Sequence, residues 1–241
     1  MNPFLKAVLL TIVIVALALL VVLQLDNTRT VELRKSIDKT LSENTERQVV
    51  QYYGQVMASD PQSQCQYLTR LRQKQFDSTY PLAQRIQDYE KNNLLNSEYQ
   101  NIKNTYFLGL TEIYLSGIEH HKLCGGDEIP LVMFYSEKND CPDCRAQNRL
   151  MPFIAQRCPK VRIYAFPSDS DLTPLQMMTD RYNISKTPTI VINDNKRLVG
   201  LSSEDEIIAA LKANGAVCDG ATVGASIPAP LTASAMVNAS S

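Results

Sequence analysis

The sequence predicts an α/β domain, with a mixed sheet flanked by helices, preceded by a transmembrane helix and an α-helical domain. Three observations favour this fold class: an apolar run near the N-terminus, a long polar stretch with apolar residues at helical spacing, and a C-terminal half in which strand and helix patterns alternate. We expect a signal anchor at 1–27, a helical domain at 28–124, the α/β domain at 125–218 and a disordered tail at 219–241. Disorder is expected because the chain from Gly220 onward is uncharged and rich in small residues.

The composition excludes some classes of function. The chain has 241 residues, enough for more than one domain, and a net charge of −1, which offers no electrostatic footprint for nucleic acid. Two of its six cysteines stand in the sequence Cys141-Pro-Asp-Cys144. The other four allow two structural disulfides if the compartment is oxidising. These four are Cys65, Cys124, Cys158 and Cys218.

The apolar run near the N-terminus is long enough to cross a bilayer. Residues 7–23 contain Thr11 as their single polar residue. A helix over residues 4–25 would rise about 33 Å, and the hydrocarbon core of a bilayer is about 30 Å thick. No small-residue cleavage site follows the run, so we expect an uncleaved signal anchor that contacts the lipid bilayer.

The charges beside this span do not decide its orientation. Lys6 precedes the span, but four basic residues follow it closely, namely Arg29, Arg34, Lys35 and Lys39. The cysteine content and the very short N-terminal tail favour an extracytoplasmic body. We therefore expect a single-pass membrane protein whose C-terminal domains lie outside the cytoplasm.

The pattern of residues 28–121 is helical. Its first apolar residues recur at helical spacing, as in Leu33, Ile37 and Leu41. Asp60-Pro61 supplies a cap and a first-turn proline for one helix, Pro81 is expected to open another, and Ser97 is expected to cap a third. The inner face of the third helix would carry Ile102, Tyr106, Leu110, Ile113 and Gly117. No strand-like alternation occurs in this stretch.

In the C-terminal half, short apolar runs indicate buried strands. We expect them at 129–135, 161–166 and 189–193, with a fourth strand at Leu198-Val199 after a turn. The predicted order is strand, helix, strand, helix, strand, strand, helix.

Helix signals lie between these strands and after the last one. A helix that begins at Cys141-Pro142, with proline in its first turn, is expected to end near Cys158. Thr173-Pro174 opens a short helix, and Ser203 forms a capping box with Glu206 at the start of the last helix.

The Cys141-Pro-Asp-Cys144 sequence therefore stands at a helix start. A helix that begins at a cysteine directs its unpaired N–H groups and the positive end of its dipole at the sulfur, which stabilises a thiolate. Cys141 is thus placed to attack a disulfide, and Cys144, one turn into the helix, is placed to resolve the product. The charge of Asp143 opposes the thiolate.

These cysteines allow two other interpretations. Zinc binding would use four residues, namely His120, Cys124, Cys141 and Cys144. Neither His120 nor His121 forms a compact ligand pair with Cys124, so we expect no metal, and paired histidines here are typical of a solvated helix end. The second interpretation is a non-enzymatic binding or scaffold protein.

The order of the motifs resembles the thioredoxin fold over about residues 128–215. Cys141-Pro-Asp-Cys144 follows the first strand, Thr187-Pro188-Thr189 precedes the third, and Gly200 precedes the capped last helix. The resemblance implies an α/β thioredoxin-like domain with a cis Pro188 beside the active-site disulfide. It also implies a substrate peptide that pairs as an added strand with the backbone of Thr187. No dissociable cofactor is implied.

The chain departs from this family at two positions near the site. Asp140 replaces the tryptophan usual before the first cysteine, and Met133 stands where thioredoxins carry a buried acid that assists proton transfer. That role passes to Glu137, to Asp143 or to water, so the redox direction stays open.

Two structural disulfides are expected. Cys65 and Cys124 bracket the helical domain, so a bridge between them would pin its second helix to the segment before the first strand. In the thioredoxin topology the active-site helix and the last helix end side by side. The resemblance therefore implies a bridge between Cys158 and Cys218.

Together these features predict a membrane-anchored, extracytoplasmic thiol:disulfide oxidoreductase that acts on protein or peptide disulfides through Cys141 and Cys144. Thr187 and Pro188 would hold the peptide. An integral membrane redox partner is favoured because anchoring raises the effective concentration beside it. The alternative is a membrane-tethered binding or scaffold protein that uses the helical domain and a degenerate thioredoxin fold.

Overall fold

The structure is a computed structural model that describes most of the chain from residue 60 onward, namely residues 60–126 and 128–218. In the N-terminal part it describes only residues 12, 14–17, 19, 20, 42, 45, 46, 48–54, 56 and 57, all of them helical. Most of the predicted span 4–25, the predicted stripe of Leu33, Ile37 and Leu41, and the tail 219–241 lie outside the described residues. Among the residues that are described, none forms a helix with both the length and the apolar character needed to cross a membrane.

The chain divides into two compact units, residues 1–59 and 60–241, and all the strands belong to the second. Its first helix, α2 (Pro61–Lys91), begins at Asp60, whose carboxylate accepts hydrogen bonds from the N–H groups of Gln62 and Ser63. This capping box matches the start expected from the sequence.

The expectation that Pro81 opens a separate helix is wrong, because Pro81 lies inside α2. A proline in a helix interior removes one hydrogen bond and typically costs about 3 kcal/mol. Here α2 continues because its inner face is buried on both sides of the proline, through Leu68 before it and Ala83 and Ile86 after it. Tertiary packing outweighs the local signal.

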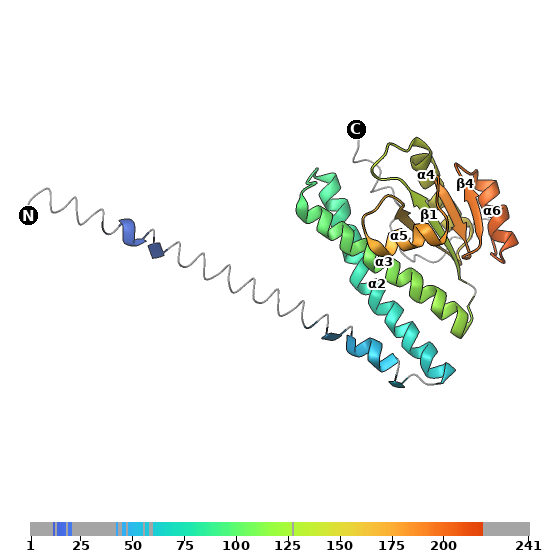
Figure 1. The fold of residues 1–241 in the computed structure, drawn as a ribbon, viewed down its shortest axis with the longest axis horizontal. Helices are drawn as coiled ribbons and strands as arrows, with labels where there is room; N and C mark the ends of the chain where they lie inside the picture. Colours follow the sequence, from blue (N-terminus) through green and yellow to red (C-terminus); the bar gives the residue numbers. More distant parts are fainter. Residues whose placement is uncertain are drawn as a thin grey trace, which may run out of the picture. The chain divides into compact units, whose positions relative to one another are not determined.

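The next helix, α3 (Ser97–Cys124), forms a hairpin with α2 (Figure 1). Its cap is Asn96, one residue before the predicted Ser97, and the side chain of Asn96 accepts a hydrogen bond from the N–H of Tyr99. The predicted inner stripe is buried at Ile102, Tyr106, Leu110 and Ile113.

Four strands form one mixed sheet in the order β2-β1-β3-β4. The strands are β1 (Ile129–Tyr135), β2 (Val161–Pro167), β3 (Thr189–Ile192) and β4 (Lys196–Val199). The central strand β1 pairs in parallel with β2 and antiparallel with β3, and β3 pairs antiparallel with β4. The observed strands lie within one or two residues of those predicted from the apolar runs.

Helices cover both faces of the sheet and make three layers. On one face α4 (Pro142–Arg157) and α6 (Glu204–Ala213) pack against Leu131 and Met133 of β1. On the other face α2, α3 and α5 (Thr173–Arg181) pack against Val132 and Phe134. Alternate residues of β1 therefore enter two different cores, as the period of two in a strand requires.

The helical hairpin shares its core with the sheet. Tyr114 of α3 contacts Tyr164 and Phe166 of β2, with ring centroids 5.2 and 6.2 Å apart, and all three rings are buried. Aromatic pairs at such distances add to the free energy gained by burying their area. From residue 60 onward, the helical region and the α/β region thus form one packed body.

All six cysteines are paired. The structure joins Cys65 to Cys124, with Cα atoms 5.4 Å apart, and Cys158 to Cys218, with Cα atoms 4.3 Å apart. These are the two pairings expected from the sequence. The first ties the start of α2 to the end of α3, and the second ties the end of α4 to the segment after α6. The third disulfide joins Cys141 to Cys144.

Candidate functional site

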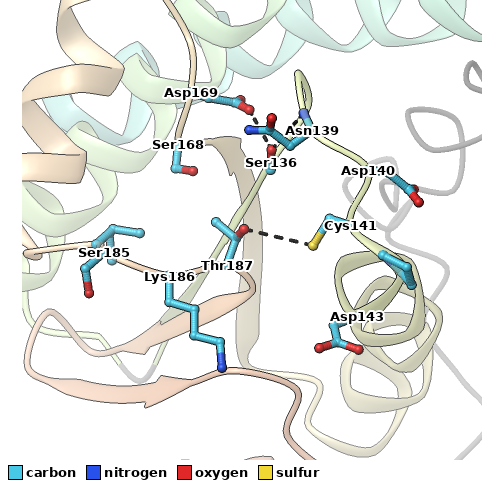
Figure 2. A pocket seen from close by; sticks show the side chains of 12 residues that line it. Ser136, Asn139, Asp140, Cys141, Asp143, Ser168, Asp169, Ser185, Lys186 and Thr187 are labelled. Carbon is cyan, nitrogen blue, oxygen red and sulfur yellow. Dashed lines mark hydrogen bonds between the residues drawn. The ribbon is translucent and has the colours of Figure 1, made fainter.

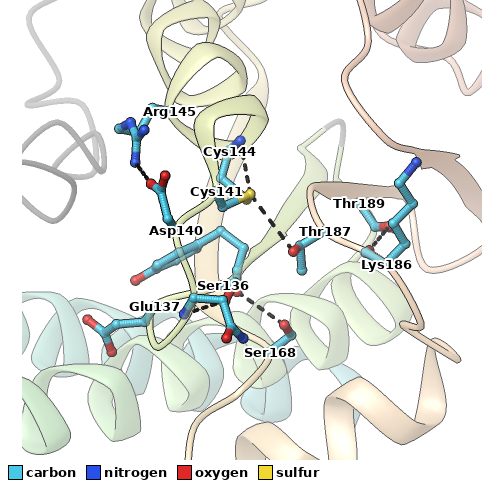
Figure 3. Close-up of a disulfide and its surroundings, with 12 residues drawn as sticks. Ser136, Glu137, Asp140, Cys141, Cys144, Arg145, Ser168, Lys186, Thr187 and Thr189 are labelled. Carbon is cyan, nitrogen blue, oxygen red and sulfur yellow. Dashed lines mark hydrogen bonds and ion pairs between the residues drawn. A yellow bond between two sulfur atoms is a disulfide. The ribbon is translucent and has the colours of Figure 1, made fainter. Parts of the chain in front are cut away.

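Cys141 is the N-cap residue of α4, and Pro142 occupies the first helical position (Figure 3). The backbone N–H of Cys144 donates to Cys141 Sγ over 3.2 Å. The sulfur therefore takes the place of the oxygen of a capping side chain and faces the positive end of the helix. The start of the helix stabilises negative charge on this sulfur when the disulfide is reduced.

The two cysteines differ in access to solvent. Cys144 is 2% exposed and belongs to the core beneath α4, whereas Cys141 is partly exposed. An attacking partner can reach the sulfur of Cys141 without unfolding the helix. The asymmetry expected from the helix register is present.

The loop before β3 faces Cys141. The Thr187–Pro188 peptide bond is cis, as the resemblance implies, and Thr187 Oγ1 lies 3.9 Å from Cys141 Sγ. The carbonyl of Pro188 accepts from the N–H of Gly200 over 2.8 Å, and the carbonyl of Lys186 accepts from the hydroxyl of Thr189 over 2.7 Å. These two bonds fix the loop on either side of Thr187.

Thr187 itself keeps its backbone groups available. Within the described part of the chain, neither its N–H nor its C=O takes part in a backbone hydrogen bond. An extended peptide beside Cys141 would satisfy both groups by pairing as an additional strand, which is the usual mode of β-augmentation.

The site opens into a cleft of about 550 Å³ (Figure 2). Residues from three segments line it: the turn after β1 with the start of α4, the turn after β2, and the loop before β3. The lining residues are Ser136, Asn139, Asp140, Cys141, Pro142, Asp143, Ser168, Asp169, Ile184, Ser185, Lys186 and Thr187.

Asp169 holds the loop that leads to Cys141. Its carboxylate accepts from Ser136 Oγ over 2.6 Å and from the N–H groups of Glu137 and Lys138 over 3.0 and 2.9 Å. Sequence reasoning did not identify this residue. The available signal was the parallel pairing of the first two strands, because parallel strands end at the same edge of a sheet.

Lys103 of α3 contacts the same loop from the helical hairpin. Its side chain is 8% exposed, its ammonium group contacts the carboxylate of Glu137, and it lies 5.3 Å from the ring centroid of Tyr99. Burial lowers the pKa of Lys103, and the charges of Glu90 and Asp169 oppose that effect. The signal in the sequence was a lysine on the inner face of an otherwise apolar helix stripe.

Glu90 completes this buried polar cluster. The hydroxyl of Tyr99 donates to Glu90 Oε1 over 2.8 Å, and Glu90 Oε2 is buried without a hydrogen-bond partner among the described residues. Burial raises the pKa of Glu90, although Tyr99 and Lys103 act in the opposite direction. The cluster places a charged contact between the hairpin and the loop that leads to Cys141.

The residues considered as proton acceptors lie in different surroundings. Met133 is buried in the core beneath α4, Glu137 is engaged by Lys103, and Asp143 is exposed on the wall of the cleft. Across the described ranges, no hydrogen bond joins a carboxylate to the sulfur of Cys141 or Cys144. Asp143 and water remain the groups with open access to the cleft.

The residues considered for a zinc site are not brought together. Cys124 is bound to Cys65 and Cys141 to Cys144, and His120 Nε2 lies 3.2 Å from Thr69 Oγ1. In the described part of the molecule, no group of three or more histidine, cysteine, aspartate or glutamate residues is arranged to hold a metal ion.

No protein-family model matches the chain, and no curated protein matches it. The solved structures to which the chain is similar include three thioredoxins. Thioredoxin f2 of Chlamydomonas reinhardtii is 18% identical over 36% of this chain and 80% of its own, with a TM-score of 0.31. Oxidised thioredoxin O2 of Arabidopsis thaliana is 17% identical over 43% and 87%, with a TM-score of 0.34. The germline-specific thioredoxin Deadhead of Drosophila melanogaster is 20% identical over 42% and 91%, with a TM-score of 0.32.

Because these identities and TM-scores are low, the fold is assigned from the strand order and the site of this chain itself. A mixed four-stranded sheet lies between helices, and a Cys-x-x-Cys pair at a helix start faces a cis proline before an antiparallel strand. The α/β part of the chain has a thioredoxin-like fold.

Proposed function

We propose that this chain is a membrane-anchored, extracytoplasmic thiol:disulfide oxidoreductase that acts on protein or peptide disulfides. One observation carries the proposal: the partly exposed Cys141, at the start of α4, lies in an open cleft beside Thr187, whose backbone groups make no backbone hydrogen bond among the described residues. This arrangement brings a nucleophile and a peptide-binding edge to one place.

In the reducing direction, the Cys141 thiolate attacks one sulfur of the client disulfide. The bond between the client sulfurs breaks, one client sulfur leaves as a thiolate and takes up a proton, and a mixed disulfide joins the other to Cys141. The Cys144 thiol then loses its proton and attacks Cys141 Sγ. The second client thiol is released, and the Cys141–Cys144 disulfide seen in the structure is formed.

In the oxidising direction the same steps run in reverse. Two electrons and two protons move between the client and the cysteine pair, so no dissociable cofactor is required. The relative reduction potentials of the pair and the client decide the direction.

The location in the proposal rests on the sequence. The apolar run at residues 4–25 supports a membrane anchor, and the two disulfides outside the site support an oxidising compartment. An integral membrane redox partner is part of the proposal, because an anchored domain meets such a partner at high effective concentration.

The division of labour between the cysteines can be tested by trapping in the full-length chain. Cys144→Ser should accumulate a mixed disulfide with client proteins, because the resolving thiol is gone. Cys141→Ser should trap little, since Cys144 is buried. Adducts would be detected on non-reducing gels after thiol blocking and identified by mass spectrometry.

The variant lacking both cysteines is the matched control and should trap nothing. Equal trapping by the two single variants would overturn the assigned roles. If neither variant trapped a client and the native chain failed to reduce insulin or to oxidise dithiols, the tethered binding protein would become the better interpretation.

A further inference from the structure

Two charged side chains on the cleft wall have no partner of their own. Asp143 lies in the first turn of α4, and Lys186 lies on the loop before Pro188; both are exposed. Within the described part of the chain, neither side chain makes a hydrogen bond or an ion pair. Figure 2 shows them on opposite sides of the space next to Cys141.

The other charges at the cleft are already engaged. Arg145 pairs with Asp140, and Lys138 pairs with Asp171 over 2.8 Å. The carboxylate of Asp169 accepts from the loop before Cys141. A bound segment would therefore find Asp143 and Lys186 as the charges that still lack a counter-charge.

Most of the other lining residues are polar. Of the twelve lining residues, Pro142 and Ile184 have aliphatic side chains, and most of the others carry hydroxyl, amide or charged groups. An apolar client side chain can bury area only against the apolar part of this surface, and it leaves the hydroxyl, amide and charged groups of the cleft without partners. A polar segment can instead replace its hydrogen bonds to water with bonds to the cleft.

Resting on the proposed function, we propose that the client is a polar, extended segment in which residues of opposite charge flank the cysteine. Its basic side chain faces Asp143 and its acidic side chain faces Lys186, while its backbone pairs with Thr187. Asp143 and Lys186 then determine the specificity of the site.

The size of the effect follows from the exposure of the two residues. An exposed ion pair typically changes an equilibrium or a rate by about fivefold at most, and long side chains often give less. Two such contacts together should give about a threefold to tenfold preference for the matched client. The preference should shrink as salt is added, because ions screen exposed charges.

The test uses the full-length Cys144→Ser chain and peptides whose single cysteine is bound to thionitrobenzoate. Cys141 attacks the peptide sulfur, the peptide–thionitrobenzoate bond breaks, and the coloured thiolate leaves while the peptide stays on Cys141. Its release rate reports formation of the mixed disulfide. The peptides carry lysine and glutamate on the two sides of the cysteine in both orders, glutamine on both sides, or leucine on both sides.

One of the two lysine–glutamate orders should react about threefold to tenfold faster than the reverse order, and glutamine peptides should react faster than leucine peptides. Exchanging the charges with Asp143→Lys and Lys186→Asp together should invert the preferred order. The matched control exchanges Asp180→Lys and Lys196→Asp. Both of these residues are exposed, Lys196 lies at the end of β4 away from Pro188, and neither residue lines the cleft, so the native order should persist.

The outcomes separate the two proposals. Equal rates for both orders, an order that the exchange does not invert, or faster leucine peptides would overturn the inferred client, while reaction of the glutamine peptide would still support the oxidoreductase. Failure of every peptide to react would overturn both.

Discussion

Glu128, the residue just before β1, bridges two arginines from different elements. Its carboxylate lies 2.9 Å from Arg72 of α2 and 2.8 Å from Arg162 of β2. Burial alone would raise the pKa of Glu128, but the hydrogen bonds and charges of the two arginines outweigh it and lower the pKa below its ordinary value of 4.5. A carboxyl group whose pKa is lowered by folding stabilises the folded state when it is ionised.

We therefore expect Glu128→Gln to lower the free energy of unfolding at neutral pH by roughly 1–3 kcal/mol, because Arg72, 14% exposed, loses its charged partner. The difference in free energy of unfolding between the native chain and the variant should stay constant above about pH 4.5, and should shrink as the pH falls through the lowered pKa of Glu128. Urea unfolding at a series of pH values measures this difference. Glu119→Gln, at an exposed position of α3, is the control; a difference that grew on acidification would contradict the assignment.

At this scale the sequence predicted the residues whose roles depend on local motifs. Cys141 and Cys144 are expected from a helix start, and Thr187 and Pro188 from the resemblance to the thioredoxin fold. Asp169 and Lys103 did not follow, because their contacts depend on distant segments. Asp169 reaches the loop before Cys141 through the parallel pairing of β1 and β2, and Lys103 reaches this loop because α3 packs on the sheet.

Two glycines of α3 differ in what surrounds them. A Cβ added at Gly109 would lie 3.2 Å from Cγ2 of the buried Thr79 and closer still to its hydroxyl oxygen. A Cβ added at Gly117 would have its nearest neighbour, the hydroxyl oxygen of Tyr164, at 3.7 Å, which is an ordinary contact. The absent side chain at Gly109 therefore sets how closely α2 and α3 approach.

The two alanine substitutions should change the free energy of unfolding in opposite directions. Gly109→Ala should lower the free energy of unfolding by about 1–3 kcal/mol through overpacking against α2. Gly117→Ala should raise it by about 0.5–1 kcal/mol, because alanine has the higher helix propensity. Chemical denaturation measures both. In a Thr79→Ala background the penalty at Gly109 should shrink, because the hydroxyl and methyl groups nearest the added Cβ are gone and the Cβ of residue 79, at 3.3 Å, remains. Changes of the same sign at the two positions would contradict this account of the α2–α3 contact.

The helices and strands agree with the prediction where side chains near their ends favour one local conformation. β1 spans the predicted residues 129–135, and α6 begins at the predicted capping box of Ser203 and Glu206. Pro81 is a local signal for a helix start, but it lies inside α2 because α3 covers the inner face of that helix. A helix continues through a proline where burial of the helix face before and after it contributes more free energy than the one lost hydrogen bond costs.

For the molecule from residue 60 onward, the role of the helical hairpin could not be read from the sequence. The apolar stripe of α3 predicted a buried face but not its partner. In the structure that partner is the sheet: Phe107 of α3, Phe134 of β1 and Phe166 of β2 belong to one core. An apolar stripe indicates that one face of a helix is buried, but the fold of the whole chain determines which element covers that face.

The two structural disulfides test this packing because they differ in burial but hardly at all in the length of the loop that they close. The structural pairs close loops with sequence separations of 59 and 60 residues, so the chain-entropy model gives each about 4 kcal/mol of stabilisation. Their accessibility differs: Cys158 and Cys218 are 0% and 3% exposed, whereas Cys65 and Cys124 are half-buried.

Thiol–disulfide exchange requires direct access of a thiolate to a sulfur, so a limiting reductant should open these bonds in a fixed order in the folded protein. Cys141–Cys144 should be reduced first through the cleft, Cys65–Cys124 second, and Cys158–Cys218 last, after the end of α4 has opened. Quenching with an alkylating agent at successive times, followed by peptide mass spectrometry, would give the order. In urea, where burial no longer protects either structural pair, the two should be reduced at similar rates because their loops are nearly equal. Loss of Cys158–Cys218 before Cys65–Cys124 in the folded state would show that the core beneath α4 opens more readily than the ends of the hairpin, against the packing described.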